Sequence, residues 1–309
     1  MSFLNAFGSH LPDRRVSNAE ISALVGTTPE WILDVSGIEE RRYAADSDTV
    51  ASLGLLAAQN CLANAGKTAA DLGMILVASG SAPRFSPGPA SQIANGLGLA
   101  ATPAYDIPVA SCGSLIGLAL AAELAPRFGP ILVIGAEIMS RCIELTPETK
   151  DTSILFGDGA GACLVDANSG FARIADSILS TDGASAEILK IENGRIAMEG
   201  RSVILQAVRK IPRVLNDLLA RNQLAASDPI EWIMHQANLN LIERVALSIK
   251  VPKERFFVNV ARYGNTSSAS LLIAADEWRG ANPGELAGPL VFTAFGAGLN
   301  WGALLALPA

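Results

Sequence analysis

Short apolar runs recur along the chain, and each gives way to a polar or glycine-marked segment. In the first half these runs predict strands at 74–79, at a segment ending in 106–110, at 131–135 and at 162–165, with helices at 89–96 and 115–124. A strand buried on both faces reads as a continuous apolar run, whereas a helix repeats its apolar positions every three to four residues. The alternation of the two patterns predicts an α/β fold.

The second half repeats the order of the first. Its apolar runs predict strands at 232–234, 256–260, 290–294 and 301–307, and helices at 239–249 and 267–277. Each half also has a Gly-Pro pair before its third strand and closes on a glycine-rich segment, 156–161 in the first half and 295–298 in the second. We therefore expect two pseudo-symmetric halves, 1–170 and 171–309, each with a parallel sheet sandwiched by helices.

Two segments, 1–50 and 171–230, lie outside this repeat. The second is polar at first and then amphipathic from 203 to 219, with apolar positions at helical spacing. We expect these segments to supply the walls of a substrate tunnel.

Composition narrows the class of protein. With 309 residues, half of them hydrophobic, and a mean hydropathy of +0.34, the chain can bury a large core. A net charge of -7 without any basic run argues against a nucleic-acid surface. The N-terminus shows no export signal, and the uncharged stretch 286–309 is broken by proline and glycine, so we expect neither export nor a membrane span.

Cysteine and histidine usage argues against a metal site. The four cysteines, Cys61, Cys112, Cys142 and Cys163, are widely spaced, and only His10 and His235 are present as co-ligands. We expect no zinc site and no disulfide framework, and reduced thiols are typical of the cytoplasm.

A candidate nucleophile lies where a strand passes into a helix. Ser111 and Cys112 occupy this turn, where the positive end of the helix dipole can lower the pKa of a thiol. A serine hydroxyl is far less acidic and would need His235 as its base. The same dipeptide taken alone is more typical of a small-residue turn that packs a helix against a sheet.

Two polar segments of the second half match this turn in position. His235 directly follows the run 232–234, and Asn265 follows Gly264. Each alone is more typical of a structural residue or a turn, but together they can point at one carbonyl oxygen. Ala297, in the segment 295–298, is a candidate to donate a backbone N–H to an oxyanion together with Ser111, although such a segment also fits a simple tight turn. The glycines at 157 and 159 fit the entry to a hairpin.

These segments together resemble the thiolase superfamily, and within it the β-ketoacyl-acyl carrier protein synthase III family. The likeness runs from residue 8 to the C-terminus. Its motifs are Glu30-Trp31-Ile32, Gly37-Ile38-Glu39-Glu40-Arg41, Phe156-Gly157-Asp158-Gly159-Ala160-Gly161-Ala162, His235-Gln236-Ala237-Asn238-Leu239, Gly264-Asn265-Thr266-Ser267 and Ala294-Phe295-Gly296-Ala297-Gly298.

The resemblance implies a homodimer of thiolase-like, five-layered αβαβα subunits that acts in fatty acid or polyketide biosynthesis without a cofactor. It implies acyl transfer from acyl-CoA to the nucleophile, followed by decarboxylative condensation with malonyl-carrier protein or malonyl-CoA. His235 and Asn265 would stabilise the enolate. It further implies substrate-binding positions at Trp31, Lys150, Gly200, Arg201, Ala237, Asn238 and Phe295.

The chain departs from this family at the nucleophile. The family's cysteine lies five residues after the strand aspartate and two before a glycine, and counting from Asp106 or from Gly113 gives Ser111 and not Cys112. Three interpretations stay open. Ser111 is the acyl acceptor, as in serine-bearing relatives that prime polyketides, or the chain carries a cysteine-to-serine change, or Cys112 serves after a local shift.

Further departures concern CoA and the carrier. In this family an arginine binds the CoA phosphate and a second arginine covers the adenine ring. The corresponding positions are Val35 and Lys150 in this chain, and Arg201 occupies a position where the family frequently has asparagine. The family's basic residues on the carrier-docking helix are replaced here by Asn240, Leu247 and Ser248. The loop 182–200 is shorter than in the family's primer synthases, which would open the pocket to a larger acyl group.

A hypothesis from another class is a non-condensing partner subunit that binds acyl chains. The missing cysteine favours it, whereas the intact His235 and Asn265 favour an enzyme.

Overall fold

Ten strands form one continuous mixed sheet in the computed structural model, which describes residues 1–309. The first half contributes β1 (Ser2–His10), β4 (Met74–Ala78), β5 (Ala104–Ile107), β6 (Ile131–Ile138) and β7 (Asp158–Asp166). The second half contributes β8 (Ala172–Thr181), β11 (Glu231–Met234), β12 (Phe256–Phe257), β13 (Leu290–Gly296) and β14 (Asn300–Pro308).

The strand order repeats between the halves. The sheet runs β12-β11-β13-β14-β8-β1-β7-β6-β4-β5, so each half has its third, second, fourth, fifth and first strands side by side. The halves meet where β1 and β8 pair antiparallel. The expected boundary between residues 170 and 171 falls in the connection between β7 and β8.

The expectation of wholly parallel sheets was wrong. β4 pairs parallel with β5 and β6, and β11 with β12 and β13, but β7 and β14 run antiparallel to both of their neighbours. The short turn between β13 and β14 forces this direction, because only antiparallel strands can be joined so tightly. A continuous apolar run reports burial on both faces and carries no information on strand direction.

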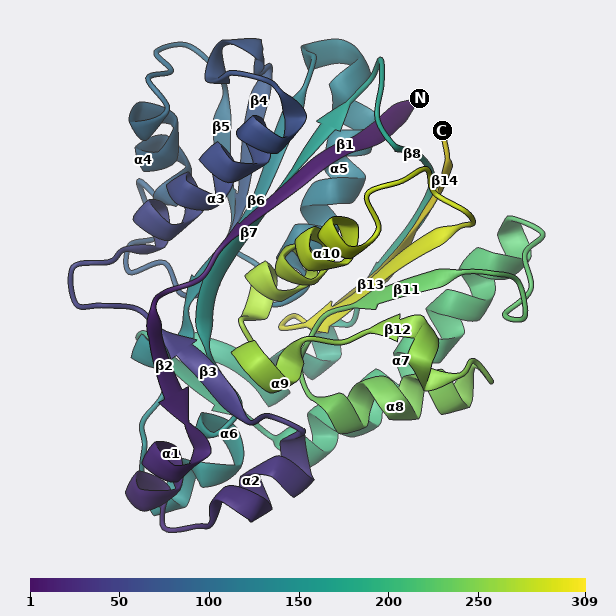
Figure 1. The fold of residues 1–309 in the computed structure, drawn as a ribbon. Helices are drawn as coiled ribbons and strands as arrows, with labels where there is room; N and C mark the ends of the chain where they lie inside the picture. The colour runs from purple at the N-terminus through teal and green to yellow at the C-terminus, as the bar shows by residue number, and fades with distance from the viewer.

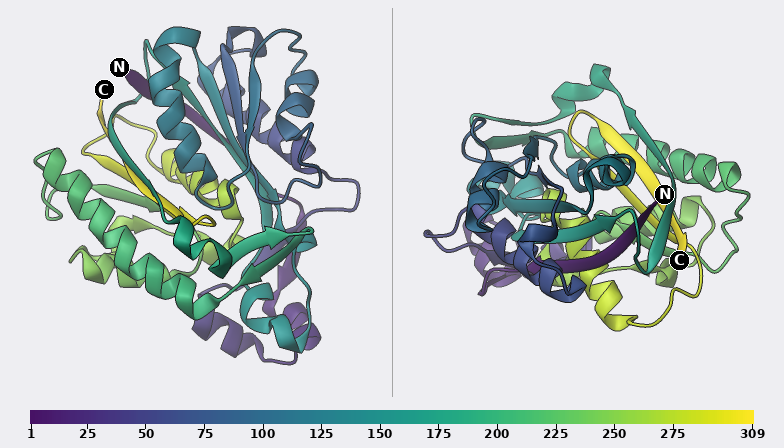
Figure 2. Two further views of the ribbon diagram at one scale, coloured as in Figure 1. Left: turned by 180° about the vertical axis from the view of Figure 1, so that it is seen from behind. Right: turned by 90° about the horizontal axis from the view of Figure 1, so that it is seen from above.

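Helices separate and cover the two half-sheets. α5 (Gly113–Phe128) and α10 (Ser270–Ala281) lie between them, whereas α3 (Val50–Ala65) and α4 (Pro89–Gly96) cover the first half-sheet from outside. α7 (Gly200–Arg221) and α8 (Leu239–Ser248) cover the second (Figure 1). The two further views in Figure 2 show the same succession of layers. The predicted five-layered αβαβα arrangement is confirmed.

Alternation along each strand divides the core. Met74 and Leu76 of β4 face the central layer with α5, while Ile75 and Val77 face α3. β6 alternates in the same way, because successive side chains of a strand point to opposite faces.

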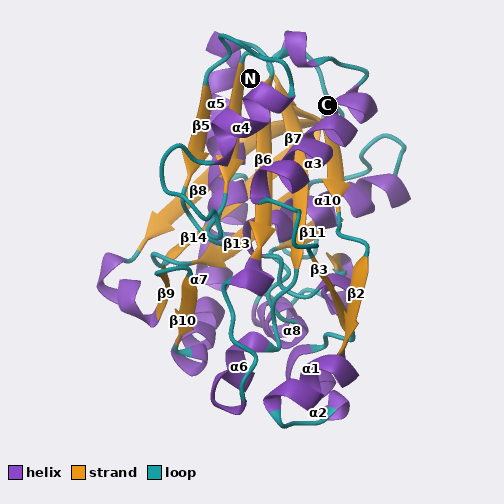
Figure 3. Ribbon diagram, turned by 90° about the vertical axis from the view of Figure 1, so that its left-hand side faces the viewer, coloured by secondary structure: helices purple, strands orange, loops and turns teal.

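Smaller elements gather at one end of the molecule. They are β2 (Arg14–Ser17), β3 (Glu40–Tyr43), α1 (Asn18–Val25), α2 (Pro29–Ser36), α6 (Lys150–Ser153), the hairpin β9 (Leu189–Glu192) and β10 (Arg195–Met198), and α9 (Val260–Tyr263). Figure 3 shows β9, β10, α6, α1 and α2 at this end. Most of them come from the two segments outside the repeat.

The glycine-rich segment at 156–161 is part of a strand and not the entry to a hairpin. β7 begins at Asp158, and Gly161 lies where α10 crosses the strand. A Cβ on Gly161 would lie 2.6 Å from Leu272 Cβ and 2.8 Å from Ile273 N, so glycine lets the central helix approach the sheet. No helix of the chain combines the length and the apolar character that a membrane crossing requires.

Candidate active site

A cavity of about 890 Å³ lies where the two halves meet the smaller elements. Ser111, His235, Asn265 and Ala297 all line it, so the structure brings together residues 186 positions apart in the chain, from Ser111 to Ala297. Ser111 comes from the first half and the other three come from the second. The convergence expected from the sequence pattern is present.

Ser111 lies in the turn between β5 and α5, two residues before the helix begins. Its φ of 64° is in the left-handed region, which non-glycine residues rarely adopt and which clusters at functional sites. The side chain lines the cavity although the residue is only 8% exposed. The N–H of Ser111 donates to Ser267 Oγ at 3.0 Å.

Cys112 points away from this cavity. It is 1% exposed, belongs to the central apolar core and is absent from the cavity lining. Burial raises the pKa of its thiol to about 12, the opposite of the lowering expected from the helix dipole. The structure therefore separates two candidates that are adjacent in sequence, since only Ser111 faces the cavity.

His235 continues β11 by one residue. Its N–H donates to Thr293 O at 2.9 Å, so the imidazole is fixed at the carboxyl end of the strand. Burial lowers the pKa of His235 to about 4, which leaves the ring neutral near pH 7. The neighbouring Gln236 holds this turn in place. Its side-chain amide donates to Met234 O and Phe257 O at 2.7 and 3.1 Å.

Ser270 positions the imidazole from the far side. Its Oγ lies 2.5 Å from His235 Nδ1 and accepts the N–H of Gln236 at 3.1 Å. Because Nδ1 is the only acceptor within hydrogen-bond distance of the Ser270 hydroxyl, we infer that the hydroxyl proton is directed to Nδ1. The ring proton then lies on Nε2, where it can be donated into the cavity.

Asn265 is oriented by its own turn. Its Oδ1 accepts the N–H of Ser267 at 2.9 Å, which leaves the two N–H donors of the amide for other partners. Its backbone is also fixed, because Asn265 N donates to Leu155 O at 2.8 Å and Asn265 O accepts from Gly157 N at 3.1 Å.

A run of serines after Asn265 connects the two halves. Ser267 accepts from Ser111 N–H, and Ser268 Oγ donates to Val109 O at 2.9 Å in the same turn. Ser268 N donates to the buried carboxylate of Glu137 at 3.2 Å. Sequence reasoning missed these serines and Ser270 as site residues. The closely spaced hydroxyl side chains between residues 266 and 270 were the feature of the sequence that could have identified them as site residues.

Gly296 allows the second contact between the halves. A Cβ there would lie 2.2 Å from Ala110 O and 2.8 Å from Ser111 Cβ, so only glycine lets the end of β13 pass the turn that carries Ser111. Ala297, the next residue, lines the cavity.

The predicted substrate-binding residues lie at the cavity with one exception. Trp31, Gly200, Arg201, Ala237, Asn238 and Phe295 line it. Lys150 is not among the lining residues, but its Nζ lies over the Trp31 ring, 5.4 Å from the centroid. Asn238 caps α8 and also donates to Val35 O of α2 at 3.0 Å, which joins two walls of the entrance.

The inner wall is apolar. Leu189 and Ile191 of β9 and Ile196 and Met198 of β10 face the cavity, so the segment 182–200 forms a hairpin over the site. The cavity has 18 hydrophobic residues among 31 in its lining, a composition suited to an acyl chain. No group of three or more His, Cys, Asp or Glu side chains is placed to hold a metal ion.

Comparison with known proteins gives one consistent family. Residues 105–183 match the family model "3-Oxoacyl-[acyl-carrier-protein (ACP)] synthase III" and residues 219–307 match the model of its C-terminal part. The chain is 38% identical to beta-ketoacyl-[acyl-carrier-protein] synthase III of Oleidesulfovibrio alaskensis, covering 98% of both chains.

Two solved structures have the same fold. The 3-oxoacyl-[acyl-carrier-protein] synthase III of Aquifex aeolicus superposes with a TM-score of 0.95 at 31% identity, over 99% of this chain and all of that one. The priming β-ketosynthase of the R1128 polyketide pathway superposes with a TM-score of 0.91 at 29% identity, over 100% of this chain and 96% of that one.

Proposed function

This chain belongs to the 3-oxoacyl-[acyl-carrier-protein] synthase III family, and we propose that it transfers an acyl group from acyl-CoA to Ser111 and condenses it with a malonyl thioester. As a member of this family it is an acyltransferase with the thiolase fold. The observation that carries the finer proposal is the convergence of Ser111, His235 and Asn265 on one cavity.

The first step is acyl transfer. Ser111 Oγ attacks the thioester carbonyl, the C–S bond breaks, and the departing CoA sulfur takes up the hydroxyl proton, while His235 Nε2–H remains a hydrogen-bond donor. We assign the Ala297 N–H as a hydrogen-bond donor to the oxyanion that forms on the thioester carbonyl oxygen. The Ser111 N–H is the second predicted donor, and its use requires exchange of the bond to Ser267 for one to the substrate.

The second step is decarboxylative condensation. The malonyl carboxylate leaves as CO₂, and the electron pair forms an enolate whose oxygen is held by His235 Nε2–H and the Asn265 amide. The carbanion attacks the acyl-serine carbonyl, the ester bond breaks, and the Ser111 alkoxide takes up a proton. A neutral histidine suits this role, because it donates a hydrogen bond without being titrated at pH 7.

The serine suggests a narrower alternative. An oxygen ester is a weaker electrophile than a thioester, so a serine enzyme favours transfer of the acyl group to an oxygen or nitrogen acceptor over carbon–carbon bond formation. The serine-dependent acyltransferase of secondary metabolism is therefore the second candidate. A cysteine-to-serine variant of a condensing enzyme would keep the same His235 and Asn265 and stays an alternative, whereas a non-condensing subunit ranks below both because His235 and Asn265 reach the cavity.

We also propose the assembly and the partners. The substrates are acyl-CoA and malonyl-carrier protein or malonyl-CoA, and no cofactor is required by the chemistry. β5 is an edge strand of the sheet, and Tyr105 on it and Phe85 nearby in the chain are 59% and 89% exposed, which supports a homodimer formed along this edge. The four free cysteines support a cytoplasmic location.

The decisive experiment is capture of the acyl-enzyme. We expect the protein incubated with a panel of acyl-CoA donors to gain the mass of one acyl group, mapped by peptide sequencing to Ser111. Ser111→Ala should gain none, and Cys112→Ala should still be acylated. An adduct on Cys112, or no adduct with any donor, would overturn the proposal.

A further inference from the structure

The exposed side of α7 carries a stripe of residues spaced four apart. Arg201, Leu205, Arg209 and Arg213 are all exposed, and residues four apart lie on one face of a helix. We call these four residues the arginine stripe. Its 12-residue span corresponds to about 18 Å along the helix at about 1.5 Å per residue.

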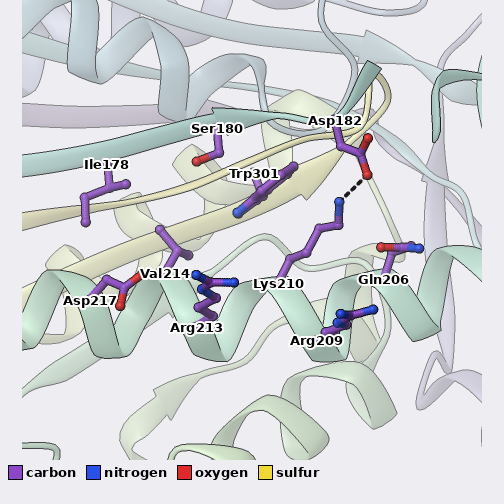
Figure 4. Close-up of a pocket in the computed structure, with 10 residues that line it drawn as sticks. All are labelled: Ile178, Ser180, Asp182, Gln206, Arg209, Lys210, Arg213, Val214, Asp217 and Trp301. Atoms are coloured by element: carbon purple, nitrogen blue, oxygen red, sulfur yellow. Dashed lines mark hydrogen bonds and ion pairs between the residues drawn. The ribbon is translucent and has the colours of Figure 1, made fainter. Parts of the chain in front are cut away.

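The three guanidinium groups of the stripe have no partner in the protein. Arg201, Arg209 and Arg213 take part in no ion pair, whereas two other cations of α7 are neutralised. Lys210 binds Asp182 at 2.5 Å and Arg221 binds Asp176 at 2.9 Å. Figure 4 shows Lys210 joined to Asp182, with Arg209 and Arg213 unpaired along the same helix. This stripe stands out in a chain whose net charge is -7.

The neighbouring helix α8 lacks a comparable surface. Its exposed residues include Leu247, which is 80% exposed, and Ser248. Arg244 is the only cation within α8 and takes part in no ion pair, and Glu243 of the same helix is paired with Lys253 at 2.6 Å. Of these two helices, α7 therefore carries most of the unneutralised positive charge.

The stripe begins at the mouth of the active-site cavity. Residues 200–204, the first turn of α7, line that cavity together with Ser111. Leu205 follows directly and is 65% exposed, and Arg209 and Arg213 continue outward beside a separate recess of about 520 Å³ at Trp301. Asp217, one further step of four along the helix, ends the positive run.

We propose that the arginine stripe is the docking surface for an acidic malonyl-carrier protein, and that it replaces α8 in this role. This inference rests on the proposed function and identifies the carrier, and not free malonyl-CoA, as the extender donor. An acidic helix of the carrier would pair with Arg209 and Arg213, while Leu205 makes an apolar contact and the thioester arm enters beside residues 200–204. Complementary charge across such a surface speeds association and fixes the register.

The test compares two malonyl donors in charge-reversal variants. Arg209→Glu/Arg213→Glu removes the outer part of the stripe and leaves Arg201, a cavity residue, intact. The matched control is Lys67→Glu/Arg127→Glu, which changes the net charge equally, with Arg127 at the end of α5 remote from Ser111. The probes are malonyl-loaded holo-acyl carrier protein and malonyl-CoA, and circular dichroism verifies that each variant is folded.

We expect kcat/KM for the malonyl-carrier protein to fall by about tenfold or more in the stripe variant, with kcat/KM for malonyl-CoA changed less than about twofold. Direct binding of fluorescently labelled holo-carrier should weaken to the same extent, and the wild-type affinity should fall with salt more steeply than that of the variant. The control should behave like the wild type.

Three results would overturn the proposal. Equal losses with both donors would assign the arginines to CoA phosphates. Unchanged carrier binding in the stripe variant would remove the docking role, as would a loss confined to Arg244→Glu. Because the binding measurement needs no turnover, an inactive enzyme that still binds the carrier through the stripe would contradict the proposed function and leave the docking inference intact.

Discussion

Ser270 Oγ lies 2.5 Å from His235 Nδ1, and it is the only side chain that forms a hydrogen bond with the His235 imidazole. The hydroxyl also accepts the Gln236 N–H, so it fixes both the ring and the turn that carries it. This contact comes from α10 of the central layer, whereas the histidine ends β11. We infer that Ser270 of α10 fixes the tautomer of the imidazole, whereas β11 fixes its position.

Ser270→Ala should lower kcat for malonyl decarboxylation by about tenfold or more with little change in KM, because the ring loses the donor that keeps the proton on Nε2. The measurement is CO₂ release under saturating malonyl thioester. Ser270→Thr, which keeps the hydroxyl, should restore part of the rate. Ser248→Ala, on the exposed side of α8, is the matched control. An equal fall in both serine-to-alanine variants would contradict the positioning role.

His235→Ala should slow decarboxylation by about 10²–10⁴, the range for loss of a positioned acid, base or hydrogen donor. Acylation of Ser111 is measured separately by intact mass. An unchanged rate of CO₂ release would remove His235 from the mechanism.

The same histidine should make stability depend on pH. Its pKa of about 4 in the folded state lies below the ordinary value of 6.5, so the unfolded chain binds more protons between these values. Stability should therefore fall as the pH drops from 6.5 toward 4, by about 3 kcal/mol at most, at about 1.4 kcal/mol for each unit of pKa shift. Urea unfolding of the wild type and His235→Gln at pH 7 and pH 4.5 checks this, because the difference between them should shrink at the lower pH. A constant difference would contradict it.

Gly296→Ala should impair both folding and acylation. Its Cβ would meet Ala110 O at 2.2 Å, which forces the nucleophile turn away from β13 and costs about 1–3 kcal/mol. Thermal unfolding and acyl-adduct formation are the two measurements. Gly183→Ala, where a Cβ meets nothing within 4 Å, should leave both unchanged. A Gly296→Ala protein with normal acylation would show that the turn tolerates the added atom.

Ser111→Cys should raise the rate of condensation by about tenfold or more, because the acyl group is then held as a thioester and a thiol is the better nucleophile. Single-turnover formation of the β-ketoacyl product measures this. If the wild-type serine enzyme instead transfers the acyl group to an alcohol or amine faster than Ser111→Cys does, the result supports the serine-dependent acyltransferase over the condensing enzyme.

The sequence pattern predicted the element order and the convergence of Ser111, His235 and Asn265, because polar segments at the carboxyl ends of neighbouring strands meet at one edge of a sheet. The expectation that each of them ends a buried strand holds for His235 alone, since Ser111 follows the partly exposed edge strand β5 and Asn265 follows α9. α4 begins and ends at the predicted residues, since Pro89 and Gly88 mark its start. The predicted strand 256–260 was longer than the strand in the structure. β12 has two residues, and α9 begins at Val260.

Other features depended on three-dimensional information that a linear pattern lacks. Ser111 and Cys112 are adjacent and both plausible nucleophiles in the sequence, and only the folded turn shows that Ser111 lines the cavity while Cys112 is buried in the core. The roles of Ser267 and Ser270 arise from contacts with Ser111 and His235, which are 156 and 35 residues away in the chain.

The serine run that holds the nucleophile turn belongs to the half of the chain synthesised last. A nascent polypeptide that has completed only its first 266 residues lacks Ser267, and with it the partner of the Ser111 N–H. His235, Asn265 and Ala297 also come from this half, so the cavity that Ser111 lines is complete only when the second half of the chain has folded against the first.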